Sequence, residues 1–507
     1  MPDEISDQTA AAASKGDAAP ERPQVDRKAR FKIPAHRPDK QAPEERIQNW
    51  GEVYRLFDES NARIEAERCI QCPAAPCQKA CPVHNDIPGA LWLLEQGDFN
   101  GAANIFRETS ELPEMCGRLC PQERLCEGHC VVGKNALPVA IGKLETFTTE
   151  WQHSHGGAQH PPPAAPSGRS VAIVGSGPAG IGAAERLARL GHSVTIYEAW
   201  PVPGGVLRYG IPNFKLNKPS IERKFEELAA LGVEVRCNVR VGEDLAWDDL
   251  RASADAVFVA IGASEGARLG IPGEDAPGVI SATEFLVRSN LPPEELPESL
   301  REPLGSPRRV VVVGGGDTSM DCVRSARRLG AEDVTLVYRR TDEEMQGRVE
   351  ERTHAVEEGV RFEFLASPVE ILLDGAGAVA GLRCVRMELG EADDTGRRRP
   401  QPVPGSEFDL PAEIVVTAIG YNVDPEWGEA VPAITRDRWD RLVVDPETMQ
   451  TNLSGVFAGG DDVNGADLVV TALADSHRAA EAIDRYLKTL LREPERDGPL
   501  VGDSSFL

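Results

Sequence analysis

Residues 169–198 contain the strand–turn–helix–strand pattern that most restricts how this chain can fold. A buried-type strand at 171–174 leads into Gly175-Ser-Gly177-Pro-Ala-Gly180, and a helix with one apolar side follows. Such glycines serve a tight turn, a close backbone approach to a pyrophosphate, and the packing of the helix on the strand. The sequence therefore predicts an α/β fold with a dinucleotide-binding domain. The expected contacts are Gly175, Gly177, Pro178, Ala179, Gly180 and, at the end of the second strand, the ribose acceptor Glu198.

A second unit of the same kind spans residues 309–340. Its valine-rich strand leads into Gly314-Gly-Gly316, a helix and another strand, with Ser319 at the position of the third glycine. This repetition predicts a second dinucleotide-binding domain. The expected contacts are Gly314, Gly316, Asp317 and Thr318.

The second unit differs from the first at the end of its second strand. Arg339 and Arg340 stand where the first unit has Glu198, and Arg348 follows closely enough to assist. Guanidinium groups suit a 2′-phosphate, so this exchange favours NADP(H) over NAD(H). The alternative is that these arginines are solvated surface residues.

Two other segments are expected to contact a flavin. Residues 204–216 are Gly-rich and too irregular for a helix, so Gly205 and Arg208 are candidates to lie near the flavin ring. Gly460 and Asp461 follow an apolar strand and precede a predicted helix at 468–490, which would aim its positive end at the cofactor. The alternatives are an ordinary loop and an Asp in a surface turn.

The order of these segments predicts a split first domain. Strands near 233–237 and 255–261 extend its sheet, and a buried strand at 414–418 is expected to return the chain to it. The predicted FAD domain therefore comprises 170–300 and 410–490, with an NADPH domain inserted at 301–409. No pair of redox-active cysteines lies near 204–216, so electrons from the flavin need another exit.

Eight of the eleven cysteines lie between residues 69 and 130, and metal clusters bound there would give the electrons such an exit. They form two sets of four, and a Cys-Pro closes the first set. Dense thiolates select iron–sulfur clusters or zinc, and Cys-Pro after closely spaced cysteines is typical of bacterial ferredoxins. Zinc ribbons and a disulfide framework are the alternatives. Free thiolates at this density fit a reducing compartment, and we expect a cytoplasmic protein.

Charge and hydropathy restrict the partners. The net charge is −26 over 507 residues, which argues against nucleic acid and against anionic membranes. No apolar run reaches the ~20 residues that a membrane span needs. The expected organisation is a flexible tail at 1–40, a helical domain at 41–152 that includes a helix over 44–67, a linker at 153–169 and a C-terminal tail at 491–507.

Together these motifs resemble the small (β) subunit of NADPH-dependent glutamate synthase. The resemblance covers roughly residues 44–490 and rests on CIQCPAAPCQKACPVHNDIP, VAIVGSGPAGIGAAERLARLGHSVTIYE, GGVLRYGIPNFKL, VVVVGGGDTSMDCVRSARRLGA and GVFAGGDDVNGADLVVTAL. The same superfamily includes the N-terminal half of dihydropyrimidine dehydrogenase and the large subunit of NADH-dependent ferredoxin:NADP oxidoreductase. Met345-Gln-Gly-Arg348 departs from the small-subunit pattern and is closer to the bifurcating relatives.

The resemblance implies cofactors and ligands that the spacing alone leaves open. It implies FAD, NADPH and two [4Fe-4S] clusters, with Cys116 left unligated. One cluster would take Cys69, Cys72, Cys77 and Cys130, and the other Cys81, Cys120, Cys126 and the non-cysteine ligand Glu145.

The function implied is electron input. NADPH would reduce FAD, the clusters would carry the electrons, and no side-chain nucleophile is required. The implied partner is the glutamate synthase large (α) subunit, which forms glutamate from glutamine and 2-oxoglutarate, or another iron–sulfur or flavin electron acceptor. This chain alone should not form glutamate. The alternatives are a subunit of a ferredoxin-linked or bifurcating transhydrogenase, and a regulatory scaffold with two zinc sites and a structural nucleotide.

Overall fold

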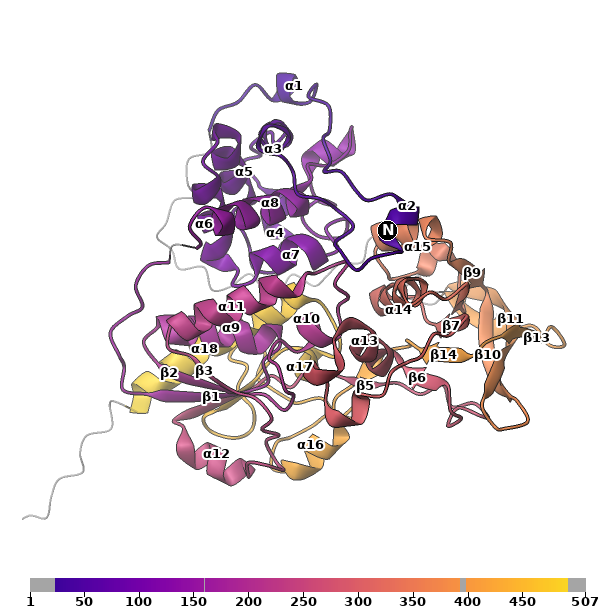
Figure 1. Cartoon of the computed structure of the whole chain (residues 1–507). Helices are drawn as coiled ribbons and strands as arrows, with labels where there is room; N and C mark the ends of the chain where they lie inside the picture. Colours follow the sequence, from indigo (N-terminus) through magenta and orange to yellow (C-terminus); the bar gives the residue numbers. More distant parts are fainter. Residues whose placement is uncertain (1–22, 159, 393–397, 491–507) are drawn as a thin grey trace, which may run out of the picture. The chain divides into compact units, whose positions relative to one another are not determined.

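The computed structural model describes residues 23–158, 160–392 and 398–490. The chain divides into two compact units. The elements of both carry the colours of the sequence in Figure 1. Unit 1 comprises Met1–Gln159, Tyr209–Lys218 and Gly266–Gly420, and unit 2 comprises His160–Arg208, Pro219–Glu265 and Tyr421–Leu507. The predicted C-terminal tail and residues 1–22 of the predicted N-terminal tail lie outside the described residues. None of the described helices is both long and apolar enough to cross a membrane.

Unit 1 begins with a helical module, coloured indigo to purple in Figure 1. Its core is made of apolar side chains such as Leu91, Leu94, Phe106 and Leu144, which are almost completely buried. Aspartates at 58, 86 and 98 accept backbone N–H bonds and start three of the helices. The helices are α1 (Arg27–Arg30), α2 (Pro43–Arg46), α3 (Glu59–Glu67), α4 (Pro76–Lys79), α5 (Ile87–Gln96), α6 (Phe99–Thr109), α7 (Pro113–Leu119), the 3₁₀ turn η1 (Val131–Lys134) and α8 (Ile141–Ser154).

Two expectations about this module are wrong. The predicted helix over 44–67 is instead two helices, α2 and α3. Between them the backbone makes a hydrogen bond outside any helix, because the N–H of Val53 donates to Phe214 O. Residues 23–40 of the predicted flexible tail pack on the module. The guanidinium of Arg30 donates to the carbonyl of Cys69 at 2.8 Å and pairs with Glu95 at 2.7 Å.

Unit 1 also contains a five-stranded parallel sheet in the order β6-β14-β7-β8-β9. Its strands are β6 (Val279–Ser281), β14 (Ile414–Thr417), β7 (Arg309–Val313), β8 (Asp333–Tyr338) and β9 (Arg361–Phe364). Helices α13 (Ala282–Asn290), α14 (Asp317–Arg328) and α15 (Val349–Glu357) accompany it, with 3₁₀ turns η2 (Pro293–Glu295), η3 (Glu298–Leu300) and η4 (Asp342–Glu344). An antiparallel sheet holds β10 (Ala366–Leu373), β11 (Val379–Ala392), β12 (Arg398–Pro402) and β13 (Phe408–Pro411).

The strand expected to return the chain to the first domain lies in this sheet instead. Ile414 pairs with Val310 and Thr417 pairs with Val313, so β14 lies beside β7. The compact segment of unit 1 accordingly runs over Gly266–Gly420 rather than 301–409. The chain leaves unit 2 at β5 (Glu265–Gly266) and re-enters it at β15 (Tyr421–Asn422).

Unit 2 is built on a parallel sheet in the order β16-β4-β1-β2-β3. Its strands are β16 (Val456–Ala458), β4 (Ala256–Val259), β1 (Ser170–Val174), β2 (Ser193–Tyr197) and β3 (Glu234–Arg236). Helix α9 (Pro178–Arg189) follows β1 and packs against the C-terminal helix α18 (Val469–Leu490). The other helices are α10 (Val206–Tyr209), α11 (Lys218–Ala230), α12 (Trp247–Ser253), α16 (Pro425–Ala430) and α17 (Asp461–Asn464). The predicted α/β class, with a helical module followed by two dinucleotide-type sheets, is confirmed.

Candidate functional site

The turn after β1 has the geometry that a pyrophosphate requires. Gly175 has a φ of +102°, and a Cβ there would collide with the carbonyl of Ala260. A Cβ on Gly180 would collide with Gly175 O, so this glycine permits helix α9 to pack on the turn. A Cβ on Gly177, by contrast, would meet nothing within 4 Å. This turn at the start of α9 therefore leaves open space beside Gly177 at a helix N-terminus, where anions bind.

Glu198 lies at this turn, as the sequence predicts. Its carboxylate accepts hydrogen bonds from the N–H of Ser176 at 3.2 Å and of Trp200 at 2.9 Å, and from the Ser176 hydroxyl. Burial raises the pKa of Glu198, while these donors oppose that shift. Ser176, which sequence reasoning did not single out, also accepts from the N–H of Gly204 at 2.8 Å. It thereby joins the turn to the Gly-rich segment.

The Gly-rich segment approaches the same turn. Gly205 has a φ of +53°, and a Cβ there would lie 2.7 Å from Gly177 Cα. The segment is not entirely irregular as expected, because Val206–Tyr209 forms α10. Arg208 is buried and its guanidinium lies 3.4 Å from Glu222, so its charge is engaged within unit 2.

The turn after β16 closes this candidate FAD site. Gly460 has a φ of +105°, and a Cβ there would lie 3.1 Å from the Cβ of Ala179. Asp461 is half-buried at the start of α17, and burial raises its pKa to about 6. The structure thus brings Gly460 beside Ala179 in the turn that holds Gly177, and the flavin contact expected of Asp461 stays a prediction. Its neighbour Asp462 is completely buried and accepts from the N–H of Ile261 at 3.1 Å.

The second dinucleotide turn, after β7, repeats this geometry. A Cβ on Gly314 would collide with Ala418 O, whereas Gly316 faces open space. Ser319, at the third glycine position, donates its hydroxyl to Ala418 O at 3.4 Å, which explains how a serine is accommodated there. Asp317 and Thr318 occupy the first turn of α14 and are half-buried.

The three arginines predicted to bind a 2′-phosphate are placed differently from one another. Arg339 is exposed at the end of β8, while Arg340 is buried and donates Nε to Arg398 O at 3.3 Å. Arg348 is 4% exposed and directs its guanidinium at Arg118 O, Gln122 and Glu350. The two Nη groups of Arg348 are therefore engaged by protein groups, and its assistance to a 2′-phosphate stays a prediction.

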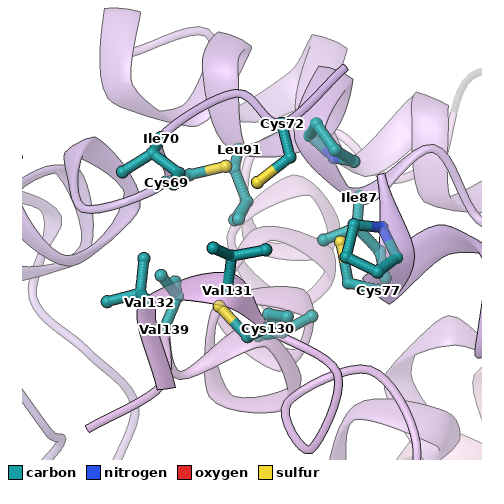
Figure 2. A pocket seen from close by; sticks show the side chains of 13 residues that line it. Cys69, Ile70, Cys72, Cys77, Ile87, Leu91, Cys130, Val131, Val132 and Val139 are labelled. Carbon is teal, nitrogen blue, oxygen red and sulfur yellow. The ribbon is translucent and has the colours of Figure 1, made fainter. Parts of the chain in front are cut away.

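Four cysteine side chains converge on one pocket of the helical module. Figure 2 shows the sulfurs of Cys69, Cys72, Cys77 and Cys130 directed toward a common space. The rest of the lining is apolar, with Ile70, Ile87, Leu91, Val131, Val132, Val139 and Ile141 among the lining residues. Burial raises the pKa of Cys69 and of Cys77 to about 12, so these thiols are held neutral until a cation stabilises the thiolate. A four-thiolate, apolar-walled pocket fits an iron–sulfur cluster.

A second group gathers around Glu145, on α8. Cys81, Cys120 and Cys126 each interact electrostatically with its carboxylate. Burial raises the pKa of Glu145 well above its usual value, and the Nδ2 of Asn85 lies 3.4 Å from its Oε1. Cys116 belongs to the same group, since it interacts with both Cys120 and Glu145. All four cysteines thus lie within electrostatic range of the Glu145 carboxylate.

Three residues near the first pocket were missed by sequence reasoning. Arg27 and Arg30 donate to the carbonyls of Cys69, Ile70 and Gln71, and Gln71 places its Nε2 3.6 Å from Cys69 Sγ. Donors and cations of this kind around cluster thiolates tune a cluster's potential. The two arginines lie in the segment taken as a tail, where no sequence pattern indicated a contact.

Comparison with known proteins agrees with both parts of the site. Residues 46–157 match the family described as dihydropyrimidine dehydrogenase domain II, 4Fe-4S cluster, and residues 169–476 match the pyridine nucleotide-disulphide oxidoreductase family. The glutamate synthase [NADPH] small chain of Escherichia coli (strain K12) is 41% identical over 450 residues, which cover 86% of this chain and 94% of that relative. The NADP(+)-dependent formate dehydrogenase subunit beta of Moorella thermoacetica is 41% identical over 437 residues, 82% of this chain and 60% of the relative.

Among solved structures, FprA from Mycobacterium tuberculosis in complex with NADPH aligns with a TM-score of 0.54 and 24% identity, over 64% of this chain and 85% of that one. This likeness bears on the fold alone. The family matches span the helical module and both dinucleotide turns, and the small-chain relative is covered almost in full. The chain is therefore an oxidoreductase of the pyridine nucleotide-disulphide oxidoreductase family with an N-terminal 4Fe-4S domain, and a homologue of the glutamate synthase small chains.

Proposed function

We propose that this chain is an electron-input subunit that oxidises NADPH and passes the electrons, through FAD and two [4Fe-4S] clusters, to the large subunit of a glutamate synthase. The observation that carries the proposal is the four-thiol pocket of Figure 2, in a chain that also has two open dinucleotide turns. In a flavoprotein with a cluster pocket, the two electrons that a hydride delivers can leave the flavin singly through the cluster. When bound, the flavin would accept a hydride from NADPH, and the clusters would carry single electrons onward.

The residues of unit 2 would hold FAD. Backbone N–H groups at the start of α9 and the open space beside Gly177 suit its pyrophosphate. Glu198 would accept from the adenosine ribose, and Asp461 would lie toward the ribityl chain. Gly205, with its positive φ, lets the Gly-rich segment run close to the turn.

The second turn would hold NADPH. Gly314 and Gly316 would bring backbone N–H groups to the pyrophosphate at the start of α14. Arg339, exposed at the end of β8, would meet the 2′-phosphate. Arg340 would support this end of the strand through its bond to Arg398 O.

The cysteine groups would hold the clusters. Cys69, Cys72, Cys77 and Cys130 would ligate the first, and Cys81, Cys120, Cys126 and Glu145 the second, with Cys116 buried beside it. The apolar wall of the first pocket would exclude water from the thiolates. A chain that keeps such clusters would work in a reducing compartment, such as the cytoplasm.

A second candidate has the same electron path but another acceptor. The identity to the formate dehydrogenase β subunit equals that to the glutamate synthase small chain, at 41%. Because these relatives share the input module and differ in the proteins that they serve, the acceptor is the part of the proposal that most needs a test.

The test is anaerobic purification of the native chain with whatever accompanies it. The isolated chain should show flavin and iron–sulfur absorption, reduce a dye with NADPH, and form no glutamate from glutamine and 2-oxoglutarate. Addition of a glutamate synthase large subunit should restore NADPH-dependent glutamate formation. A colourless protein, or glutamate formed by the chain alone, would contradict the proposal. Co-purification of a dehydrogenase or a ferredoxin-type partner would favour the second candidate.

A further inference from the structure

A chain of hydrogen bonds within unit 1 joins the second dinucleotide turn to the cysteine segment 116–126. It begins at the turn itself, where the N–H of Gly347 donates to Gly315 O at 3.0 Å. The next residue, Arg348, donates its backbone N–H to the Oδ1 of Asp317 at 2.9 Å. Asp317 is the first residue of α14, directly after Gly316. The backbone at 347–348 is therefore fixed to the residues that would surround a nucleotide.

The side chain of Arg348 extends this chain into the helical module. Its Nη1 donates to Arg118 O and its Nη2 to the Oε1 of Gln122, both at 2.9 Å. Gln122 is buried, and its Nε2 donates to Gly117 O at 3.0 Å and to Cys116 O at 3.4 Å. The backbone N–H of Gln122 donates to Cys120 O at 2.9 Å. One buried arginine thus contacts the segment that carries Cys116, Cys120 and Cys126.

Burial makes this contact electrostatically important. The guanidinium is 4% exposed, so its charge is weakly screened by solvent. Glu350 lies 3.2 Å from Nη2, and Glu123 lies 4.0 Å from Nε. A planar fork that binds a carbonyl and an amide oxygen at once fixes their positions, which a lysine cannot reproduce.

We propose that Arg348 is a positioning residue that couples nucleotide occupancy of the second turn to the iron–sulfur centre held by the 116–126 segment. This rests on the proposed function. A bound nucleotide contacts the turn beside Asp317 and Gly347, and any shift of these residues moves the Arg348 fork. The fork moves the carbonyls and the charge that face the cysteine segment. By linkage, the oxidised and reduced centre must then bind the nucleotide with different affinities.

Redox titration with oxidised nucleotide tests this coupling, because NADP⁺ binds without delivering electrons. The midpoint potential of each cluster in the purified holoprotein is measured by EPR, with and without saturating NADP⁺. We expect NADP⁺ to shift the midpoint potential of one of the two clusters. The shift should correspond to roughly a fivefold or larger ratio between the NADP⁺ affinities of the oxidised and the reduced protein, where a tenfold ratio equals about 59 mV for one electron. The absence of any shift in the wild-type protein overturns the proposal.

Variants locate the coupling. In Arg348→Gln we expect a lower potential for the same cluster, since a buried cation stabilises the added electron, and loss of most of the NADP⁺ shift. Arg348→Lys keeps the charge but not the fork, so the potential should stay near the wild-type value while the NADP⁺ shift falls. If Arg348→Gln has a reduced iron content, the NADP⁺ shift of Arg348→Lys is compared with that of the wild-type protein instead. Arg352→Gln is the matched control and should retain the shift, because Arg352 lies in the first turns of α15 and its side chain donates to Asp342 O, outside this chain of contacts.

Two results distinguish the alternatives. A raised KM for NADPH with unchanged cluster signals in Arg348→Gln would make Arg348 a phosphate ligand after all and overturn the inference. Wild-type protein without cluster signals, or without NADPH-dependent dye reduction, would instead contradict the proposed function. If the wild-type protein shows cluster signals and NADPH-dependent dye reduction but no NADP⁺ shift, the coupling proposal is wrong and the proposed function stands.

Discussion

Lys215 Nζ lies 2.8 Å from Asp321 Oδ1 within unit 1, and this buried ion pair ties the Gly-rich segment to helix α14. The preceding residue, Phe214, packs its ring under the guanidinium groups of Arg324 and Arg328, at 4.5 and 3.9 Å. Lys215 therefore fixes the end of the Gly-rich segment to the second dinucleotide domain, although the sequence predicted that this segment contacts the flavin.

Lys215→Gln should destabilise the protein. It leaves the carboxylate of Asp321 buried without its cation, a change that typically costs about 3–5 kcal/mol. Urea unfolding followed by tryptophan fluorescence measures the loss. The double variant Lys215→Gln, Asp321→Asn should regain part of it, because the unpaired charge is removed. A double variant as unstable as the sum of the two single variants would mean that the pair does not interact.

Cys116→Ser tests which residues complete the second cluster. If Glu145 is the fourth ligand, this variant should keep its full iron and sulfide content, whereas Cys81→Ser and Cys130→Ser should each lose about half of the iron, one cluster of two. Iron analysis and EPR of the anaerobically purified proteins provide the measurement. Loss of one cluster in Cys116→Ser, with retention in Glu145→Gln, would replace Glu145 by Cys116 in the ligand set.

Gly177→Ala separates cofactor binding from folding. The added methyl meets no protein atom within 4 Å, so the free energy of unfolding of the apoprotein should change little. The same methyl would stand where the FAD pyrophosphate approaches the backbone, so the FAD content after gel filtration should fall at least tenfold. Gly180→Ala is the contrasting variant, since its methyl would collide with Gly175 O and should impair folding itself. Normal FAD retention in Gly177→Ala would contradict the assigned site.

Glu358 should make the stability of unit 1 depend on acid pH. Burial opposes its ionisation, but the guanidinium groups of Arg324 and Arg328 hold its pKa at about 2, below the ordinary 4.5. A depressed carboxyl pKa contributes stability above the unfolded value and loses it as the pH falls from 4.5 toward 2. The advantage of wild type over Glu358→Gln in urea unfolding should therefore be constant above about pH 5.5 and shrink below about pH 4.5. The exposed Glu343→Gln should show no such trend, and a pH-independent advantage would contradict the assignment.

The sequence predicted the dinucleotide turns well because their requirements are local. Gly175 and Gly314 both need a positive φ, and Glu198 lies at the end of a strand that pairs with β1 in register. The same reasoning misplaced β14. A run such as Ile-Val-Val-Thr is buried on both faces in either parallel sheet, so composition alone does not indicate which sheet it joins.

Sequence reasoning missed the contacts at the candidate site that join residues far apart in the chain. Arg348 follows a strand that ends in arginines, which makes a phosphate contact a reasonable expectation. Only the fold brings it to Arg118 and Gln122, more than 220 positions earlier in the chain. Arg30 was missed for the same reason, because its partners, the carbonyl of Cys69 and the carboxylate of Glu95, lie 39 and 65 positions away.

Helices α7 and α8 approach closely enough that Gly117 and Gly142 cannot be replaced without displacing backbone. A Cβ on Gly117 would lie 2.7 Å from Gly142 O, and a Cβ on Gly142 would lie 2.8 Å from Gly117 O. Cys116 stands beside one of these glycines and Glu145 lies one turn beyond the other. A cluster ligated by Glu145 would lie beside this close backbone contact, which leaves its ligand little room to move when the charge of the cluster changes. The reorganisation energy for electron transfer would then be small, which favours fast transfer at little driving force.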